Sequence, residues 1–261
     1  MELLERGDPL LELGRLLGEA DAGAGRLAFV AGEAGIGKTS LVRRFGQLVR
    51  DRATVLTGGC DPLSTPRPLG PLLDVAPRLP GASVRISEGK DTLFRDVLDA
   101  LGGGGRPLVL VFEDLHWADE ATLDLVRFLA RRIEDRRALL IGTYRDDEVG
   151  AGHPLRLVLG DVATAPAVRR LVLRPLSPGA VGALAAGSGM DAGALAERTG
   201  GNPFFVTEIL AAAGERIPGT VRDAVLARAA RLPEPARAVL DAAAVIGFRS
   251  EPWLLLEVTR A

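Results

Sequence analysis

One glycine-rich segment constrains the fold of this chain more than any other feature. It follows the pattern G-x-x-x-x-G-K-T, directly before Ser40, with the residues Gly32, Glu33, Ala34, Gly35, Ile36, Gly37, Lys38 and Thr39. An apolar run of strand type, 27–31, precedes it, and apolar residues recur at helical spacing over 41–49. A strand, a glycine loop and a helix in this order place backbone N–H groups and a helix N-terminus around a phosphate. The segment therefore predicts a nucleotide site in which residues 32–40 contact the phosphates.

Lys38 is chemically unusual within this sequence. Of the 32 basic residues, Lys38 and Lys90 are lysines and all the others are arginines. A slim ammonium group reaches between two phosphates, whereas a planar guanidinium has a different shape and fits badly there. We therefore expect Lys38 to bridge the β- and γ-phosphates and the hydroxyl of Thr39 to ligate Mg²⁺.

A second signal lies at the end of the apolar run 108–112, which is followed by Glu113 and Asp114. In open α/β sheets, ligands bind at the carboxyl ends of the strands. Two carboxylates at such a place can divide the work. One holds Mg²⁺, directly or through water, and the other orients or deprotonates the attacking water. We expect Glu113 and Asp114 to be catalytic residues and to share the metal with Thr39.

A third signal follows the next apolar run, 138–143, where Arg145 stands two residues further on. A cation at that strand end can reach the γ-phosphate and report its presence. We expect Arg145 to act in this way, and the alternative is an ordinary surface arginine in an arginine-rich chain.

Three other side chains near these signals need an interpretation of their own. His116 and Trp117 follow Asp114, and we expect both to pack in that loop rather than to contact phosphate. The sequence indicates no partner for His153. None of the three enters the predicted site.

Composition and charge narrow the classes of function. The net charge is −2 over 261 residues, so the chain lacks the overall positive field of a nucleic-acid-binding protein. The single cysteine, Cys60, allows no internal disulfide and suits a reducing cytosol. No apolar run approaches membrane-spanning length, and the acidic start is unlike a signal peptide. We expect a cytoplasmic protein with no membrane partner, in which Cys60 is an inert core residue.

The order of apolar runs predicts an α/β fold. Runs that are apolar at every position are typical of parallel strands covered on both faces. Helices are expected between the strands, with Asp8 and Asp119 as N-cap residues, and the pattern is helical throughout after Pro175. Within that helical part, Asn202 and Pro203 suit the N-cap and the first residue of a helix. The expected strands are 27–31, 54–57, 108–112, 138–143 and 168–173.

Three further segments carry a resemblance to a known family. They are LHWAD at 115–119, GTYRD at 142–146 and GGNPFF at 200–205. Together with the glycine loop, they resemble the ATPase domain of STAND-type signalling proteins. Within that class, the chain is most similar to the large ATP-binding regulators of the LuxR family, relatives of the maltose regulator. The start of the chain around Arg6 is similar to that group too, and so is Ile217-Pro218 before a helix pair.

The resemblance implies a fold as well as a function. It implies an ASCE-type P-loop NTPase, with a five-stranded parallel sheet between helices, in which the strand before Arg145 lies between the glycine-loop strand and the Glu113 strand. A small helical lid and the start of a winged helix would follow. The first helix of the winged helix would be 236–246, closed by Gly247, and the second 251–258. The domain limits implied are 1–174, 175–232 and 233–261.

The resemblance also implies cofactors and partners. ATP or ADP with Mg²⁺ would bind, Arg6 would contact the nucleotide and Pro203 would pack near the adenine. The chain would be an ATP-binding and slowly ATP-hydrolysing switch module of a signal-responsive transcriptional regulator. Self-association in the ATP state stays open, and DNA would be contacted only through a C-terminal domain outside this chain.

Two features depart from the family pattern. The acidic pair of the family begins with Asp, whereas here Glu113 comes before Asp114, which leaves the division of roles between them open. The chain also ends at Ala261, within the expected winged helix, so we expect a fragment of a longer protein.

Other classes of protein share parts of this pattern. A small-molecule kinase would have the same glycine loop but an acceptor pocket and several lid arginines. An initiator-like ATPase would present a basic DNA-facing surface, which a net charge of −2 does not favour. An adaptor that holds ADP without turnover is a third alternative.

Overall fold

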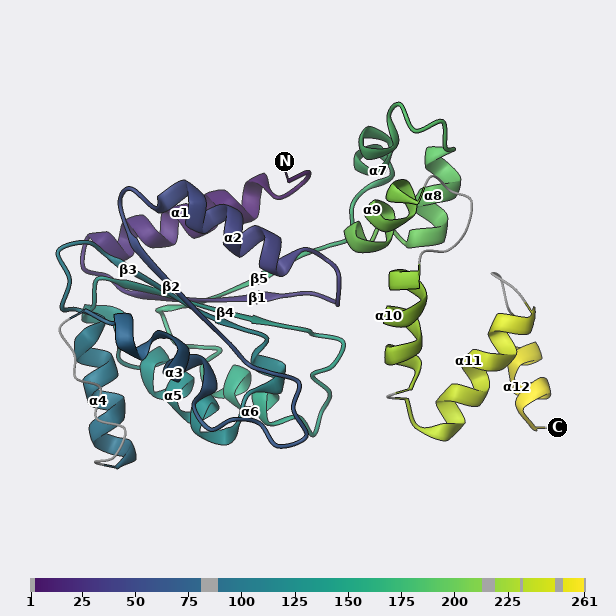
Figure 1. The fold of residues 1–261 in the computed structure, drawn as a ribbon. Coiled ribbons are helices and arrows are strands. Elements are labelled where there is room, and N and C mark those ends of the chain that lie inside the picture. The colour runs from purple at the N-terminus through teal and green to yellow at the C-terminus, as the bar shows by residue number, and fades with distance from the viewer. Residues whose placement is uncertain (1–2, 81–88, 213–218, 231, 247–250, 261) are drawn as a thin grey trace. The chain divides into compact units, whose positions relative to one another are not determined.

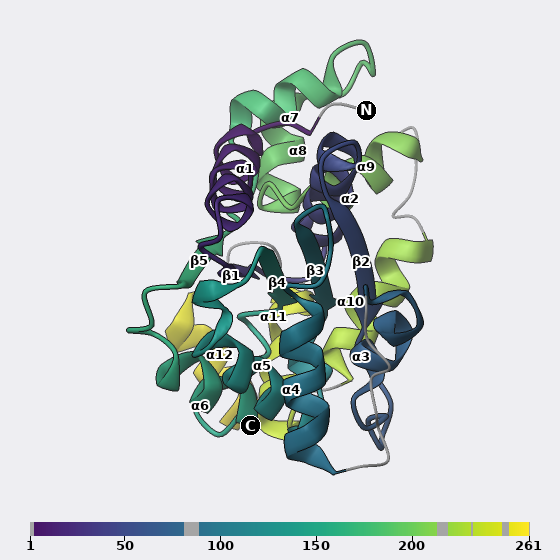
Figure 2. The same cartoon turned by 90° about the vertical axis from the view of Figure 1, so that its left-hand side faces the viewer.

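The computed structural model describes residues 3–80, 89–212, 219–230, 232–246 and 251–260. The chain divides into two compact units, 1–180 and 181–261. The first unit has three layers, in which one sheet lies between helices on both of its faces (Figures 1 and 2).

The sheet of the first unit has five parallel strands in the order β2-β3-β4-β1-β5. The strand that precedes Arg145 is β4, and it pairs with β1 on one side and β3 on the other. This confirms the predicted fold class and the predicted place of that strand. The strands are β1 (Arg26–Ala31), β2 (Thr54–Gly59), β3 (Leu108–Glu113), β4 (Ala138–Tyr144) and β5 (Val168–Val172).

Helices cover the sheet unequally (Figure 1). One face carries α1 (Gly7–Asp21) and α2 (Lys38–Val49). The other face carries α3 (Gly70–Val75), α4 (Lys90–Ala100), α5 (Glu120–Ala130) and α6 (Pro154–Asp161). Short 3-10 turns complete the connections at η1 (Ala76–Arg78), η3 (Leu115–Trp117) and η4 (Ile133–Asp135).

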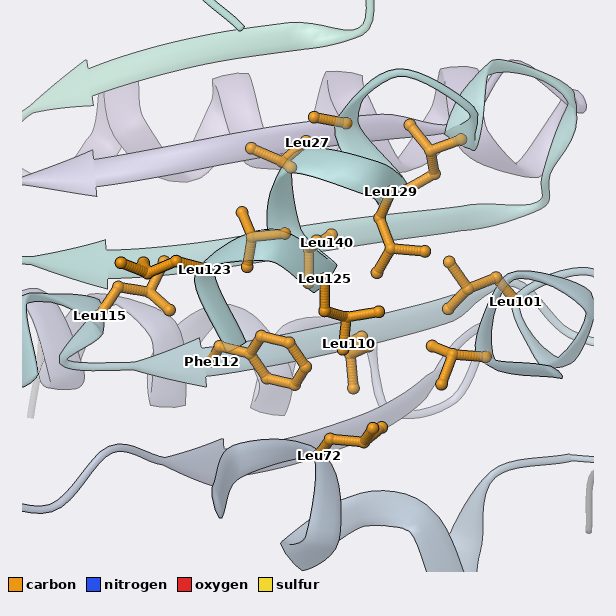
Figure 3. Packing of buried hydrophobic residues seen from close by; sticks show 14 of the residues in the cluster. Leu27, Leu72, Leu101, Leu110, Phe112, Leu115, Leu123, Leu125, Leu129 and Leu140 are labelled. Carbon is orange, nitrogen blue, oxygen red and sulfur yellow. The ribbon is translucent and has the colours of Figure 1, made fainter. Parts of the chain in front are cut away.

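The core forms two layers because successive residues of a strand point to opposite faces of the sheet. In β4, Leu140 packs in the cluster beneath α4 and α5, whereas Leu139 and Ile141 pack in the cluster beneath α1 and α2. Figure 3 shows the first cluster, in which Leu110 and Phe112 of β3 lie among leucines of the covering helices. Each fully buried leucine contributes about 1.5–3 kcal/mol relative to an exposed one. Both faces of the central strands are therefore apolar, which explains their unbroken apolar sequence.

Helix ends agree with the prediction in one case and differ in another. Asp119 caps α5 as predicted, because its carboxylate accepts from the backbone N–H groups of Ala121 and Thr122. The prediction that Asp8 caps α1 was wrong. The helix begins at Gly7, with Arg6 at the N-cap position. Leu10 N donates to the carbonyl of Arg6, so the helix starts where the buried guanidinium of Arg6 anchors the chain.

The regular elements described in the second unit are all helices, joined by turns and short loops, as the sequence predicted. Asn202 caps α9 by accepting from Phe204 N, and Pro203 is the first helical residue, again as predicted. Ile217, Pro218 and Gly247 lie outside the described residues. The helices are α7 (Pro178–Ala185), α8 (Ala192–Thr199), α9 (Pro203–Ala211), α10 (Gly219–Ala229), α11 (Glu234–Ile246) and α12 (Pro252–Arg260).

The names of the two smaller domains stay predictions, as do the limits at 174 and 232. The helix pair α11 and α12 matches the extent expected for the first two helices of a winged helix, without testing that identity. Within the described part of the chain, every helix falls short of the length and apolarity needed to cross a membrane.

Candidate functional site

The glycine loop between β1 and α2 has a backbone that only glycine adopts readily. Gly32, Gly35 and Gly37 have φ values of 149°, 80° and 100°, all in the left-handed half of the map. Gly32 also has no room for a side chain, because an added Cβ would lie 2.9 Å from Ile36 Cγ2 and 3.1 Å from the carbonyl oxygen of Leu173. The loop is thus held against the end of β5. Of its other residues, Glu33 and Ala34 are half-buried, and Ser40 is exposed.

Lys38 turns its ammonium group back into the loop. Its Nζ donates to the carbonyl oxygens of Gly32, at 2.6 Å, and Glu33, at 2.9 Å, and the residue is only 7% exposed. Burial lowers the pKa of Lys38, and the charge of Asp114 opposes this. Within the described part of the chain, this buried ammonium is held by two neutral carbonyls and has no carboxylate in direct contact, which favours an anionic ligand.

Thr39 and Glu113 bring the loop and β3 together. The hydroxyl of Thr39 donates to Oε2 of Glu113, across neighbouring elements that meet at the carboxyl edge of the sheet. Both groups offer hard oxygen atoms, which Mg²⁺ prefers. Two of the three predicted metal ligands are therefore in contact, and their donor set fits Mg²⁺.

Asp114 has an unusual backbone. Its φ of 59° is left-handed, and its N–H donates to Oγ1 of Thr143 at the end of β4. A non-glycine residue in this region costs about 1–2 kcal/mol, so the neighbouring structure must impose it. Burial raises the pKa of Asp114, and the positive charges of Arg145 and Lys38 oppose that rise. Thr143 was not among the predicted site residues, although a hydroxyl at the end of the neighbouring strand was the available signal.

A glycine lets the turn after Asp114 lie close to the sheet. At Gly142 in β4, an added Cβ would lie 2.5 Å from Cδ1 of Leu115, the first residue of η3. Leu115 is fully buried in the cluster of Figure 3. This close approach fixes η3, and with it the aromatic side chains that follow.

Arg145 lies next to this turn, at the predicted edge. Its Nη1 pairs with Oε1 of Glu148 at 2.5 Å, and its guanidinium carbon lies 4.7 Å from the centre of the Trp117 ring. Its charge reaches both Lys38 and Asp114, since it affects the pKa of each. The structure thus places Arg145 near the loop, held by a carboxylate and an indole.

The described contacts of His116 and His153 are with neighbouring protein groups, which they pack against or hydrogen-bond. The His116 side chain is completely buried, its ring stacks against Trp117 at 4.5 Å, and its Nδ1 accepts from Arg145 N at 3.4 Å. His153 Nδ1 accepts from Leu155 N, which caps α6, and its Nε2 lies 3.0 Å from the carbonyl oxygen of His116. The packing expected of His116 and Trp117 is what the structure has. The partner of His153 was missed because it comes from a residue 37 positions away.

Arg6 lies beneath the glycine loop. It is 5% exposed, and its Nη2 donates to the carbonyl oxygens of Ile36, at 3.0 Å, and Arg174, at 2.9 Å. The preceding residue, Glu5, accepts from the backbone N–H and the hydroxyl of Ser177. The guanidinium therefore touches the loop backbone, and a direct contact of Arg6 with nucleotide stays a prediction. Pro203 belongs to the other compact unit, so its contact with adenine stays a prediction too.

Five of the charged or hydroxyl side chains of the predicted site thus lie at one sheet edge. Lys38 and Thr39 follow the loop after β1, Glu113 ends β3 with Asp114 directly after it, and Arg145 follows β4. Among the described residues, no group of three or more histidine, cysteine or acidic side chains forms a metal cage. Mg²⁺ with nucleotide commonly relies on one or two carboxylates together with phosphates and water.

Comparison with known proteins found a relative that matches part of this chain. An uncharacterised protein of Rhizobium meliloti (strain 1021) is 27% identical over 207 residues, which are 60% of this chain and 20% of that protein. This chain therefore spans about a fifth of the length of that relative.

Two solved structures share the fold. Cdc6p of Pyrobaculum aerophilum has a TM-score of 0.57 at 16% identity, over 99% of this chain and 80% of that one. The Orc1 protein of Aeropyrum pernix, solved in complex with DNA, has a TM-score of 0.53 at 16% identity, over 99% and 77%. At these identities the likeness shows the fold alone, which is that of a P-loop NTPase.

A family model described as the AAA ATPase domain matches residues 2–141, more than half of the chain. The match runs from the N-terminus into β4, and it includes the glycine loop and the acidic pair at the end of β3. The chain belongs to the AAA ATPase domain family.

Proposed function

We propose that this chain is an ATP-binding, slowly ATP-hydrolysing switch module of a signal-responsive transcriptional regulator of the LuxR type. The observation that carries the ATPase part is the meeting of Lys38, Thr39, Glu113, Asp114 and Arg145 at the carboxyl ends of neighbouring parallel strands. The regulator part rests on the resemblance of 115–119, 142–146 and 200–205 to that family.

Phosphate binding falls to the glycine loop and Lys38. The ammonium group of Lys38 exchanges the carbonyls of Gly32 and Glu33 for the oxygens of the β- and γ-phosphates. The positive end of the α2 dipole and the loop N–H groups add to the attraction. Because Lys38 is already buried, little water needs to be removed from it when phosphate binds.

Hydrolysis falls to the acidic pair. The Thr39 hydroxyl and the Glu113 carboxylate would hold Mg²⁺, which would offset phosphate charge when bound. Asp114, whose pKa is raised mainly by burial, is the better candidate to orient the attacking water and to accept its proton. This division follows from the contact between Thr39 and Glu113, in which Asp114 takes no part.

Regulation would use the difference between ATP and ADP. Arg145 is within electrostatic reach of Lys38, and the γ-phosphate is the group that the two nucleotides do not share. A switch needs such a differential contact, because a ligand that binds two conformations equally well does not change the equilibrium between them. We further propose closure of the second unit with Pro203 near the adenine, self-association in the ATP state, a cytoplasmic location and DNA contact through another part of the protein.

The deciding experiment is calorimetric titration of the purified chain with ATP and with ADP in the presence of Mg²⁺. Lys38→Ala is expected to lose at least about tenfold in affinity for both nucleotides. The matched control is Lys90→Ala, since Lys90 is the only other lysine and pairs with Asp124 on the face of α4 and α5. Unchanged ATP affinity in Lys38→Ala would sink the site assignment.

Turnover and the bound nucleotide separate the alternatives. Slow phosphate release with water as the acceptor supports a hydrolase, whereas phosphoryl transfer to an added small molecule indicates a kinase. ADP released on denaturing the purified protein, without turnover, indicates an ADP-holding adaptor. Salt-dependent binding of this chain to duplex DNA indicates an initiator-like ATPase.

A further inference from the structure

Arg145 is held on two sides by side chains that are not part of the phosphate site. Glu148, three residues further on, pairs with its Nη1, and the two side chains are 26% and 20% exposed. The ring of Trp117, from the turn η3, lies under the guanidinium at 4.7 Å. Arg145, directly after β4, therefore has both an acidic partner and an aromatic support.

The support is itself fixed by buried neighbours. The completely buried ring of His116 stacks against Trp117, and its Nε2 lies 3.7 Å from Oε2 of Glu148. The carbonyl of His116 is in turn contacted by His153 Nε2 at 3.0 Å. One buried ring, that of His116, thus lies against both Trp117 and Glu148.

The two contacts on Arg145 differ in kind. The contact with the indole acts through the charge of the cation and does not need the guanidinium N–H groups as hydrogen-bond donors. The Glu148 carboxylate accepts from Nη1 of Arg145, a donor that a phosphate oxygen could also use. A γ-phosphate therefore competes with Glu148, but not with Trp117.

We propose that Glu148 and Trp117 are positioning residues for Arg145, and that together they set how strongly the site distinguishes ATP from ADP. Trp117 keeps the guanidinium at the phosphate edge, and Glu148 restrains it until γ-phosphate oxygens replace the carboxylate. ADP lacks those oxygens and leaves the pair with Glu148 intact. This inference rests on the proposed nucleotide site and assigns to it a discriminating element outside the glycine loop.

Two substitutions move the discrimination in opposite directions. In Glu148→Gln, the competing charge is lost while the shape is kept, so the ratio of ATP to ADP affinity rises about twofold to fivefold, the range for a partly exposed ion pair. In Trp117→Leu, the support is lost and the ratio falls. Glu148→Asp retains the charge and keeps the ratio closer to that of the parent protein than Glu148→Gln does.

A spectroscopic measurement follows Arg145 directly. The chain has two tryptophans, and Trp253 is 66% exposed on α12. In a Trp253→Phe parent, Trp117 is the only indole, and its emission reports the cation on its ring. A non-hydrolysable ATP analogue with Mg²⁺ is expected to change this emission more than ADP does, and Arg145→Gln is expected to remove the difference.

A matched control exists elsewhere on the same unit. Arg132 lies over the ring of Phe128, 4.2 Å from its centre, and is exposed. Arg132→Gln removes a comparable cation–aromatic contact and is expected to change neither the affinity ratio nor the Trp117 signal. Circular dichroism of each variant confirms that the compared proteins are folded.

The outcomes separate the two levels of proposal. If the parent protein binds both nucleotides and Glu148→Gln leaves the ratio unchanged, the role of Glu148 is wrong while the nucleotide site stands. If Arg145→Gln shows the same difference in Trp117 emission between the ATP analogue and ADP as the parent protein, the role of Trp117 is wrong while the nucleotide site stands. Failure of the folded parent protein to bind either nucleotide overturns the proposed function and this inference with it.

Discussion

The hydroxyl of Thr39, in the first turn of α2, donates a hydrogen bond to the carboxylate of Glu113, the last residue of β3. The two residues are 74 positions apart in the chain, and the parallel sheet brings them together at its carboxyl edge. Asp114, one residue further, has a left-handed backbone, and its N–H donates to Oγ1 of Thr143. The adjacent acids therefore have different surroundings, from which different roles follow.

The first prediction concerns the hydroxyl of Thr39. In Thr39→Val, the ligand oxygen and the hydrogen bond to Glu113 are both lost, so the Mg²⁺-dependent part of nucleotide affinity is expected to fall about tenfold. Thr39→Ser keeps the hydroxyl and is expected to stay close to the parent protein. Titrations with Mg²⁺ and with a chelator measure the difference, and equal losses in both variants would contradict a role for the hydroxyl.

The second prediction separates the two acids. Asp114→Asn keeps a side chain that tolerates a left-handed backbone but cannot accept a proton, so turnover is expected to fall at least about a hundredfold while nucleotide affinity is retained. Glu113→Gln removes charge beside Thr39 and is expected to weaken Mg²⁺-dependent binding itself. Phosphate release and calorimetry on the same samples test this, and the reverse pattern would exchange the two roles.

The third prediction concerns Arg6. Arg6→Ala leaves the buried carbonyl of Ile36 and the partly buried carbonyl of Arg174 without their charged donor, which is expected to reduce the free energy of unfolding by about 2–3 kcal/mol and to weaken nucleotide binding through a looser loop. Arg15→Ala is the control, since Arg15 pairs with Glu12 and Glu19 at the surface. Urea unfolding compares the two, and similar small losses would show that the Arg6 contacts do not hold the loop.

The fourth prediction concerns the thiol of Cys60. Burial is the main factor that raises the pKa of Cys60 to about 12, and the carboxylates of Asp119 and Asp114 add to it. At pH 8 the native thiol is expected to react with iodoacetamide about a thousandfold more slowly than in urea, because the thiolate is the reactive form. Fast labelling of the folded protein at pH 8 would contradict this.

The same shift in the pKa of Cys60 makes the folded protein less stable at alkaline pH. The folded state holds the thiol proton more tightly than the unfolded state, whose pKa is near 9.0. The unfolded state therefore binds fewer protons once the pH exceeds about 9, and stability is lost as the pH rises toward about 12. Cys60→Ala is expected to reduce this alkaline loss, which thermal unfolding at pH 8 and pH 10 measures.

The sequence alone determined the fold class, the strand positions and the phosphate loop, because these depend on local patterns. Apolar runs marked the central strands, and a loop with glycines at 32, 35 and 37 admits few backbone shapes. The same reasoning found Glu113, Asp114 and Arg145, since residues that follow neighbouring parallel strands meet at one edge. It also found the cap at Asn202, which needs only neighbouring residues.

Only the tertiary structure decided which partners these side chains have. The contact of Arg6 with Ile36 and Arg174, the pairing of Thr39 with Glu113, and the place of Trp117 under Arg145 join segments that are distant in sequence. The periodic pattern of apolar residues does not predict such contacts, because each depends on how the sheet and its connections bring two chain segments together. The sequence thus named the charges of the site, and the packing of the sheet decided what holds each one.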